Sequence, residues 1–341
     1  MKRLLPFIIS LILILCSCGE CTVVKNDFMM DTVITYTIKS PVADKIIDEC
    51  REICEEHEDI FSAYDEDSAV SRFNRDGELV TVDFVPLEKV LRVCKKLYAE
   101  TDGAFDITVA PLVKLWSVNH ASESWTPPEY AEIAALLPHI GMDKLSFGTA
   151  TVSRDSDITQ IDLGGVAKGY TLGTAASHIQ NNYGTASGTV SFGGNIALIG
   201  RKSDGTPWNV GIKNPFDTSS IIGTLSLDSG IVAVSGAYER YAMHDGKIYH
   251  HIIDPKTGCP AESDLASAAV WVETADSDSG ALADALSTAL FVMGHDKALE
   301  FYNHIKTTGL AELAFEAVLI KNDGSVTVTS GLKERFLTYE K

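Results

Sequence analysis

The spacing of apolar residues along the chain predicts both helices and strands. An apolar stripe with helical period runs through residues 42–61, and another runs through residues 86–100. Alternation of apolar and polar residues predicts a strand at 32–38, TVITYTI, and a hairpin in RYAMHDGKIYHHIID. The Asp245-Gly246 pair inside this second segment is a two-residue turn signal.

The other segments complete a mixed pattern. Residues 63–78 are polar and predict a loop, and the segment TDGAFDITVAPLVKLW predicts a turn followed by a short helix. Further helices are expected at 125–141, 164–184 and 278–294, and further strands at 159–163, 187–200, 207–215, 221–227 and in a last hairpin within 313–332. Because strands and helices do not alternate strictly, the predicted fold class is α+β rather than a doubly wound parallel sheet.

Composition and charge narrow the range of partners. The chain has 341 residues, of which 45% are hydrophobic, so it has ample material for a large core in one domain or two. Lys and Arg total 28 against 47 Asp and Glu, which gives a formal net charge of −19. This charge argues against nucleic-acid binding through phosphates. It would also repel anionic lipid, so any tie to a membrane must come from another feature.

The N-terminus supplies such a feature. The basic start MKR is followed by the apolar run LLPFIISLILILC, which is too short for a comfortable transmembrane helix and is typical of a signal peptide. Ser17 before Cys18 resembles a bacterial lipobox, so we expect residues 1–17 to be removed and Cys18 to carry lipid. The mature chain would then comprise residues 18–341. A plain cleaved signal or a short anchor is the alternative.

The cysteines do not form a metal-binding or disulfide pattern. Cys50, Cys54 and Cys94 fall on the apolar faces of the two amphipathic helices, where buried cysteines act as small hydrophobic residues. Beyond residue 21 the sequence has no CxxC and no Cys/His cluster with zinc spacing.

A glycine-rich stretch, QIDLGGVAKGY at residues 160–170, stands between a predicted strand and a predicted helix. Glycines at such a place allow main-chain N–H groups and a helix N-terminus to bind an anion. The spacing matches neither the Walker motif nor the dinucleotide GxGxxG fingerprint. Close packing of the helix is an equally good account of the glycines.

Two further motifs carry candidate chemistry. Asp284 and Thr288 are four residues apart in a predicted helix, so both oxygens lie on one face and suit Mg²⁺. Taken alone, this pair is better explained by a Thr hydrogen-bonded to its own helix and an Asp placed for the helix dipole. In the segment YHHIIDPKTG, His251 shares a strand face with Tyr249, and His250 points to the other face. His251 is a candidate general base, although a single such histidine is often structural.

The motifs together resemble one known family. TDGAFDIT, IDLGGVAKGY, SFGGNIALIG, HHIIDPKTG and DALSTALFVMG occur in this order and resemble the successive signatures of the ApbE family, the FAD:protein FMN transferases. The resemblance runs from residue 29 to residue 294. It implies a single large α+β domain of mixed sheets with packed helices, related to the T-fold.

The resemblance also implies site residues. The Mg²⁺ ligands would be the main-chain oxygen of Gly165, where many members have alanine, and the side chains of Asp284 and Thr288. Some members have an aspartate where Ser287 stands here, so no third acidic ligand is expected. Lys168 would add a positive charge near the phosphates, unless it pairs with a carboxylate. The residues that match flavin-site positions are Met30, Tyr64, Ala104, Phe105, Asp106, Asp162, Lys168, His251 and Ile253.

The implied activity is Mg²⁺-dependent transfer of FMN from FAD to a Thr or Ser hydroxyl of a target flavoprotein, with release of AMP. FAD is then a substrate, His251 takes the hydroxyl proton, and the product is a phosphoester. Two alternatives stay open: an FAD pyrophosphatase that forms FMN and AMP, and a lipoprotein that binds flavin without turnover. An exported, lipid-anchored protein at the bacterial inner membrane or at the cell surface fits this family.

Overall fold

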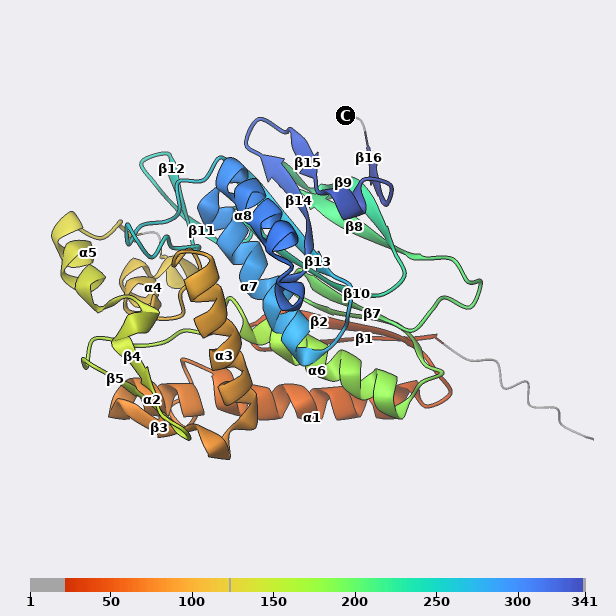
Figure 1. Ribbon diagram of the computed structural model, residues 1–341, viewed down its shortest axis with the longest axis horizontal. Helices are drawn as coiled ribbons and strands as arrows, with labels where there is room; N and C mark the ends of the chain where they lie inside the picture. The colour runs from red at the N-terminus through yellow and green to blue at the C-terminus, as the bar shows by residue number, and fades with distance from the viewer. Residues whose placement is uncertain (1–21, 123, 340–341) are drawn as a thin grey trace, which may run out of the picture.

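The computed structural model describes residues 22–122 and 124–339, and its centre is a large antiparallel sheet (Figure 1). Within these residues the sheet has eight strands in the order β1-β2-β6-β7-β10-β13-β14-β15. The strands are β1 (Thr22–Met29), β2 (Thr32–Lys39), β6 (Ser187–Phe192), β7 (Asn195–Ile199), β10 (Gly230–Gly236), β13 (Leu265–Val272), β14 (Glu316–Lys321) and β15 (Val326–Val328).

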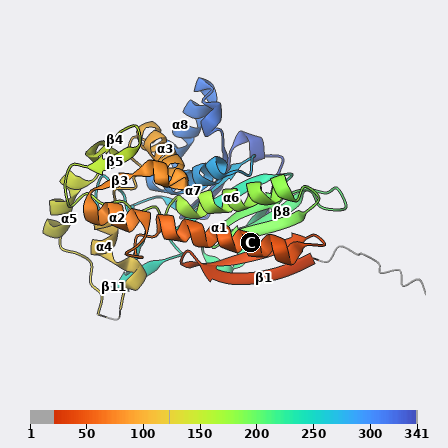
Figure 2. The same ribbon diagram turned by 90° about the horizontal axis from the view of Figure 1, so that it is seen from below.

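Helices cover one face of this sheet, as Figures 1 and 2 show. They are α1 (Ala43–Phe61), α3 (Val85–Glu100), α6 (Ala167–Asn182), α7 (Ser277–Met293) and α8 (His295–Thr308). The largest hydrophobic cluster lies between helices and sheet, with Ile34, Ile46, Leu97, Ile179 and Phe291 among its members. Helix α7 is buried almost all round because it lies between the sheet and its neighbouring helices.

A small second sheet covers part of the opposite face. It has the order β16-β9-β8, formed by β8 (Trp208–Asn214), β9 (Asp217–Leu227) and β16 (Phe336–Thr338). Ile212 and Leu225 of this sheet share a hydrophobic cluster with Val232 and Trp271 of the large sheet. The large sheet is therefore apolar on both faces where the second sheet covers it.

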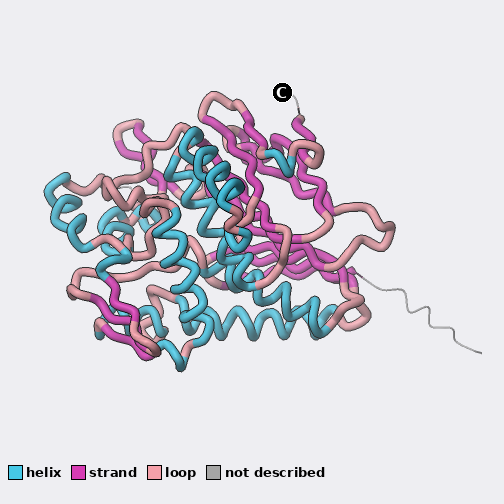
Figure 3. Tube along the Cα trace, in the orientation of Figure 1, coloured by secondary structure: helices cyan, strands magenta, loops and turns pink. Residues whose placement is uncertain are grey.

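The remaining elements surround one end of the large sheet (Figure 3). They are α2 (Ala69–Asp76), α4 (Ala110–Trp116), α5 (Tyr130–Leu136), a three-stranded sheet of β3 (Glu78–Val80), β5 (Thr151–Arg154) and β4 (Leu145–Phe147), and a hairpin of β11 (Tyr241–His244) and β12 (Lys247–His250). Short 3-10 turns are η1 (Thr81–Asp83), η2 (Val118–His120), η3 (Leu137–His139), η4 (Met142–Lys144), η5 (Ala311–Leu313) and η6 (Ser330–Leu332).

Helices α6 and α7 cross with their backbones in contact. A Cβ atom added to Gly169 would lie 2.1 Å from the carbonyl oxygen of Gly280, and one added to Gly280 would lie 2.0 Å from the carbonyl oxygen of Gly169. At Gly173, one turn further along α6, a Cβ would lie 2.0 Å from the carbonyl oxygen of Asp276. Close helix packing is therefore what requires glycine at 169 and 173.

Most of the expected elements are confirmed, including the amphipathic helices α1 and α3 and both hairpins. At the turn of the β11–β12 hairpin, Asp245 and Gly246 both have positive φ angles, of 49° and 76°. Cys50, Cys54 and Cys94 are buried thiols, as expected from the helical stripes. No helix among the described residues is long and apolar enough to cross a membrane. The predicted signal peptide and Cys18 lie outside the described residues.

Three local predictions are wrong. Residues 63–78 contain α2, because Ser68 accepts the N–H of Ser71 at its start and Gly77 ends it with a φ of 83°. Residues 159–163 do not form a strand but only an isolated bridge between Gln160 and Val109. Helix α6 begins at Ala167 rather than at 164, because the two preceding glycines belong to the connecting turn.

The contact between α6 and α7 predicts a strong effect of a single methyl group. Gly169→Ala places a Cβ against main chain that cannot move aside, so we expect it to cost about 3 kcal/mol of unfolding free energy, at the upper end of overpacking effects. Gly184→Ala is the matched control, because its nearest neighbour, the oxygen of Gln180, is 3.8 Å from the new Cβ. Urea unfolding measures both. Equal midpoints for Gly169→Ala and the parent would contradict this account of the crossing.

Candidate active site

A large cavity of about 940 Å³ opens beside the crossing of α6 and α7. We call it the large cavity. Its wall includes all twelve predicted site residues that lie in the described part of the chain: Met30, Tyr64, Ala104, Phe105, Asp106, Asp162, Gly165, Lys168, His251, Ile253, Asp284 and Thr288. These residues are far apart in the sequence, and the fold brings them to one place.

The α6–α7 crossing positions the candidate metal ligands. The N–H of Gly169 donates to Oδ2 of Asp284 at 2.9 Å, and no described residue donates to the other oxygen, Oδ1. Thr288 lies one turn later on α7, and its Oγ1 is 3.5 Å from the position that a Cβ of Gly165 would take. The Oγ of Ser235 lies 3.1 Å from Oγ1 of Thr288. Gly165, the carboxylate of Asp284 and the hydroxyl of Thr288 thus belong to one wall.

This set of oxygens fits Mg²⁺ better than it fits a transition metal. Carboxylate, carbonyl and hydroxyl oxygens are hard ligands, and Mg²⁺ in proteins commonly has one or two carboxylates with water and phosphate completing its shell. Among the described residues, no group of three or more His, Cys, Asp or Glu side chains is placed to hold a metal ion. Ser287 donates to the carbonyl oxygen of Asp284 at 2.8 Å, so it supports the helix.

The glycine stretch forms the neighbouring part of the wall. Asp162 accepts the N–H of Gly164 at 2.7 Å through Oδ1, which fixes the turn before α6. The ammonium group of Lys168 donates to the carbonyl oxygen of Gly164 rather than to a carboxylate. Lys168 therefore has no carboxylate partner among the described residues, and it lines the cavity where an anionic ligand could reach it.

The segment after α3 contributes a buried carboxylate. Asp106 accepts both the N–H and the hydroxyl of Thr108 on one oxygen, at 2.8 and 2.7 Å. Burial raises the pKa of Asp106 to about 6, although these two hydrogen bonds oppose the rise. Phe105 beside it is buried, and its ring lies 3.3 Å from the position that a Cβ of Gly165 would take. A larger residue at 165 would therefore press on this ring.

The two adjacent histidines have different environments. Nδ1 of His251 lies 3.1 Å from the carbonyl oxygen of Arg240, and a carbonyl only accepts, so the neutral ring carries its proton on Nδ1. Its Nε2 is then an unprotonated acceptor. Burial lowers the pKa of His251 to about 4, with a smaller contribution from the charge of Arg240. His251 and Ile253 both line the large cavity.

His250 is a structural residue. Its Nε2 donates to the carbonyl oxygen of Ala261 at 3.0 Å, its Nδ1 accepts the N–H of Ile252 at 3.3 Å, and its ring packs edge-on against Phe291. The predicted strand alternation did not extend to His251, because β12 ends at His250. The two histidines differ instead in their hydrogen bonds: both ring nitrogens of His250 have partners, whereas only Nδ1 of His251 has one among the described residues.

Several cavity residues were not anticipated from the sequence. Arg240 donates from its guanidinium to Oδ2 and to the carbonyl oxygen of Asp31, both at 2.7 Å. Met30 and Asp31 form the β1–β2 turn with positive φ angles of 53° and 55°, and an aspartate followed by a strand was the only available signal of that turn. Glu239 also lines the cavity, and burial raises its pKa.

The fold and the cavity define a mixed α+β protein with one large ligand site at a crossing of two helices. A model of the ApbE family matches residues 30–314, and the chain belongs to this family. The chain is 32% identical over 324 residues to the FAD:protein FMN transferase of Haemophilus influenzae, covering 88% of this chain and 90% of that one. It is 33% identical over 275 residues to the enzyme of the same name from Vibrio cholerae, covering 78% of this chain and 80% of the relative.

Solved structures agree with this assignment. The ApbE protein of Thermotoga maritima superposes with a TM-score of 0.82 at 30% sequence identity, covering 92% of this chain and 99% of that one. The flavin transferase ApbE of Vibrio cholerae superposes with a TM-score of 0.80 at 27% identity, covering 93% and 99%. The predicted α+β class and the predicted family are confirmed.

Proposed function

We infer that this chain is an FAD:protein FMN transferase. The relatives that match most of its length carry this name. The observation that best supports the inference is the large cavity, where three hard oxygen ligands, one unpaired lysine and one neutral histidine share a wall. Such a wall suits a phosphate-bearing substrate whose phosphorus is attacked by a hydroxyl.

The carbonyl oxygen of Gly165 and the side chains of Asp284 and Thr288 would hold Mg²⁺. The ion, when bound, offsets the charge of the FAD pyrophosphate and stabilises the AMP that leaves. The free Oδ1 of Asp284 is the oxygen that its hydrogen bond with Gly169 leaves available. A main-chain ligand also explains why glycine serves at 165 where many family members have alanine.

The chain's own residues bind and activate the two substrates. Lys168 adds a point charge near the phosphates, and the turn at 104–106 with Met30, Tyr64, Asp162 and Ile253 surrounds the rest of FAD. The acceptor hydroxyl of a Thr or Ser bonds to the FMN phosphorus while the bond from that phosphorus to the AMP oxygen breaks. The hydroxyl proton goes to Nε2 of His251. The product is a protein with FMN in phosphoester linkage.

Hydrolysis of FAD is the second candidate activity. Water can take the place of the acceptor hydroxyl at the same base and phosphorus, and it then yields FMN and AMP. A protein that only stores flavin would need neither the candidate base nor the metal ligands, so their convergence on one wall favours turnover. Incubation with FAD and Mg²⁺, with and without a threonine-containing target protein, followed by mass spectrometry separates the three activities.

The location of the enzyme follows from its N-terminus. The basic start, the short apolar run and Ser17 before Cys18 support lipid attachment at Cys18 after removal of residues 1–17. The catalytic domain of residues 18–341 then works outside the cytoplasm, tied to the membrane by lipid alone.

The role of His251 predicts a separation of binding from transfer. His251→Ala removes the base but no group that holds FAD, so transfer should fall by ~10²–10⁴-fold with FAD affinity nearly unchanged. The neutral ring is the active form, so at FAD concentrations far below saturation, where the free enzyme is what titrates, the parent's transfer should be flat near pH 7 and should fall as the pH drops toward the pKa of about 4. FAD titration and single-turnover transfer across this pH range measure both effects.

His250→Ala is the matched control for that experiment. It leaves the carbonyl of Ala261 without its donor and opens space beside Phe291, so the melting temperature should fall. Transfer per folded molecule should stay near the parent value. If His250→Ala were the inactive variant, or if His251→Ala transferred at the parent rate, the base would have to be sought among Asp106, Asp162 and Asp254.

If Asp284 and Thr288 hold Mg²⁺, replacing each of them should reduce activity, but by different amounts. Asp284→Ala removes the one charged ligand, so Mg²⁺-dependent activity should be largely lost while the fold is retained. Thr288→Ala should cost less, because water can replace a hydroxyl as a ligand. The measurement is activity against Mg²⁺ concentration, with circular dichroism to verify the fold. Full activity of Asp284→Ala in EDTA would exclude this metal site.

The lipid anchor predicts a change of location without a change of chemistry. Cys18→Ala should move the protein from the membrane fraction to the soluble fraction, with flavin binding intact. Cys21→Ala, three residues away, is the control and should stay with the membrane. Fractionation followed by immunoblotting measures both. If Cys18→Ala remained membrane-bound, the N-terminal segment would be a transmembrane anchor.

A further inference from the structure

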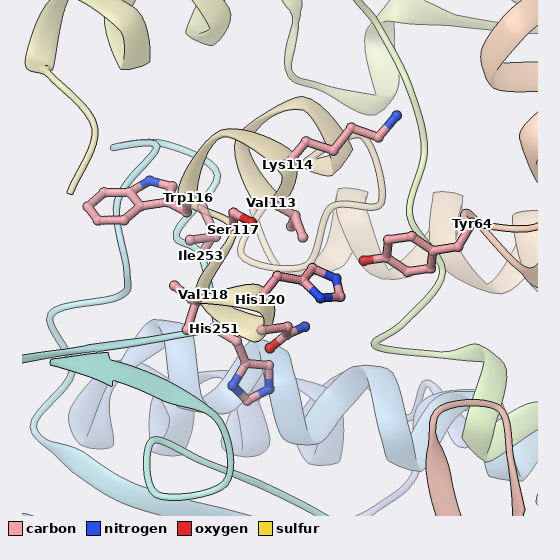
Figure 4. A pocket seen from close by; sticks show the side chains of 10 residues that line it. Tyr64, Val113, Lys114, Trp116, Ser117, Val118, His120, His251 and Ile253 are labelled. Atoms are coloured by element: carbon pink, nitrogen blue, oxygen red, sulfur yellow. The ribbon is translucent and has the colours of Figure 1, made fainter. Parts of the chain in front are cut away.

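A second, smaller cavity of about 140 Å³ adjoins the large one, and we call it the small cavity (Figure 4). Lys114, Trp116, Ser117 and Val118 line it without lining the large cavity, whereas His251 and Ile253 line both. Tyr64, Val113, Asn119 and His120 also line both cavities, so the border between them includes the candidate base but is not confined to it. The residues that line the small cavity alone belong to neither the proposed flavin site nor the proposed metal site.

The candidate metal ligands all lie on the large-cavity side of this border. Gly165, Asp284 and Thr288 line the large cavity and not the small one. In phosphoryl transfer the attacking and leaving oxygens are roughly in line with the phosphorus between them. If the leaving group is held at the metal ligands, the attacking hydroxyl must arrive from the side of His251, where the small cavity opens.

The volumes of the two cavities are consistent with each cavity receiving a different substrate. The large cavity is at the upper end of the range of about 300–1,000 Å³ for small-molecule sites, so a dinucleotide does not need the additional space. The small cavity is too small for a flavin ring system but has room for a short side chain. We propose that the small cavity receives the acceptor segment of the target protein and directs its Thr or Ser hydroxyl to His251.

The wall of the small cavity is rigidly built. The indole N–H of Trp116 donates to the carbonyl oxygen of Gly258 at 2.7 Å, and the ring packs against Tyr249 with centroids 5.7 Å apart. Ser117 follows it in the left-handed conformation, with φ 47° and ψ 33°, and its N–H donates to the carbonyl oxygen of Val113. Residues other than glycine rarely adopt left-handed backbone angles, and those that do are concentrated at functional sites.

The turn at Ser117 also directs polar groups to the opening. Val118–His120 forms η2, which places Asn119 and His120 where the two cavities join. No described residue hydrogen-bonds the side-chain amide of Asn119. This amide offers both a donor and an acceptor, which is what the main chain of an extended acceptor segment would need.

The assignment rests on the proposed function and adds the path of the second substrate. The oxygen of the acceptor hydroxyl forms its bond to the FMN phosphorus, its proton goes to Nε2 of His251, and the electron pair of the broken bond leaves on AMP. The small cavity contributes position only. It should therefore affect transfer to protein and leave the cleavage of FAD by water unchanged.

Two substitutions at one position test this separation. Ser117→His fills the small cavity with a side chain that tolerates positive φ, and Ser117→Gly keeps the turn while leaving the cavity open. The measurements are FAD affinity, FAD cleavage by water without acceptor, and transfer to the apo form of a protein that carries threonine-linked FMN. For Ser117→His we expect kcat/KM for the acceptor to fall at least tenfold, with the other two values within twofold of the parent. Ser117→Gly should resemble the parent in all three.

Other outcomes would overturn the assignment. A tenfold loss of FAD affinity in Ser117→His would make the small cavity part of the flavin site. Equal losses of transfer in Ser117→His and Ser117→Gly would trace the effect to the turn, and unchanged transfer in Ser117→His would show that the acceptor takes another path. A parent enzyme that cleaves FAD but never labels the target would instead overturn the proposed function, and the assignment with it.

Discussion

The contact between the backbones of α6 and α7 is the constraint on which the rest of the site depends. Because Gly169 and Gly280 have no side chains, the helices approach until the N–H of Gly169 reaches Asp284 at 2.9 Å. The same crossing brings Gly165, just before α6, next to Thr288 on α7. Gly169, which looked like part of a phosphate-binding loop, thus serves helix packing, and the arrangement of the candidate metal ligands is a consequence of that packing.

Burial and one carbonyl group prepare His251 for its proposed role. The carbonyl of Arg240 holds the proton on Nδ1, and burial lowers the pKa to about 4, so the ring is a weak base when no ligand is bound. A phosphate beside the ring favours its protonated form and raises the pKa toward neutrality. The strength of the base is therefore coupled to the presence of the anionic substrate.

The sequence predicted the α+β class, the amphipathic helices and the cavity residues that sit in motifs. It did not reveal β10 or β13, because strands buried on both faces show no alternation of apolar and polar residues. It also missed α2, whose polar composition suggested a loop although Ser68 and Gly77 mark its ends. The link from Asp31 to Arg240 joins residues 209 positions apart, and no local pattern encodes such a contact. The left-handed backbone of Ser117 could not be predicted either, because serine has no sequence preference for that conformation.

The charges around the large cavity support a metal ion as part of binding as well as chemistry. Six carboxyl residues line it, namely Asp31, Glu58, Asp106, Asp162, Glu239 and Asp284, against three cationic residues, Lys168, Lys213 and Arg240. Arg240 is already paired with Asp31, and burial favours the neutral forms of Asp106 and Glu239. Three carboxylates, Glu58, Asp162 and Asp284, then remain against two lysines, so the cavity carries no net positive charge. The proposed ligand nevertheless brings a negatively charged pyrophosphate. A divalent cation at Asp284 resolves this imbalance, since it adds positive charge where a carboxylate and a phosphate would otherwise repel each other. The proposed metal thus allows an acidic protein to bind an acidic substrate.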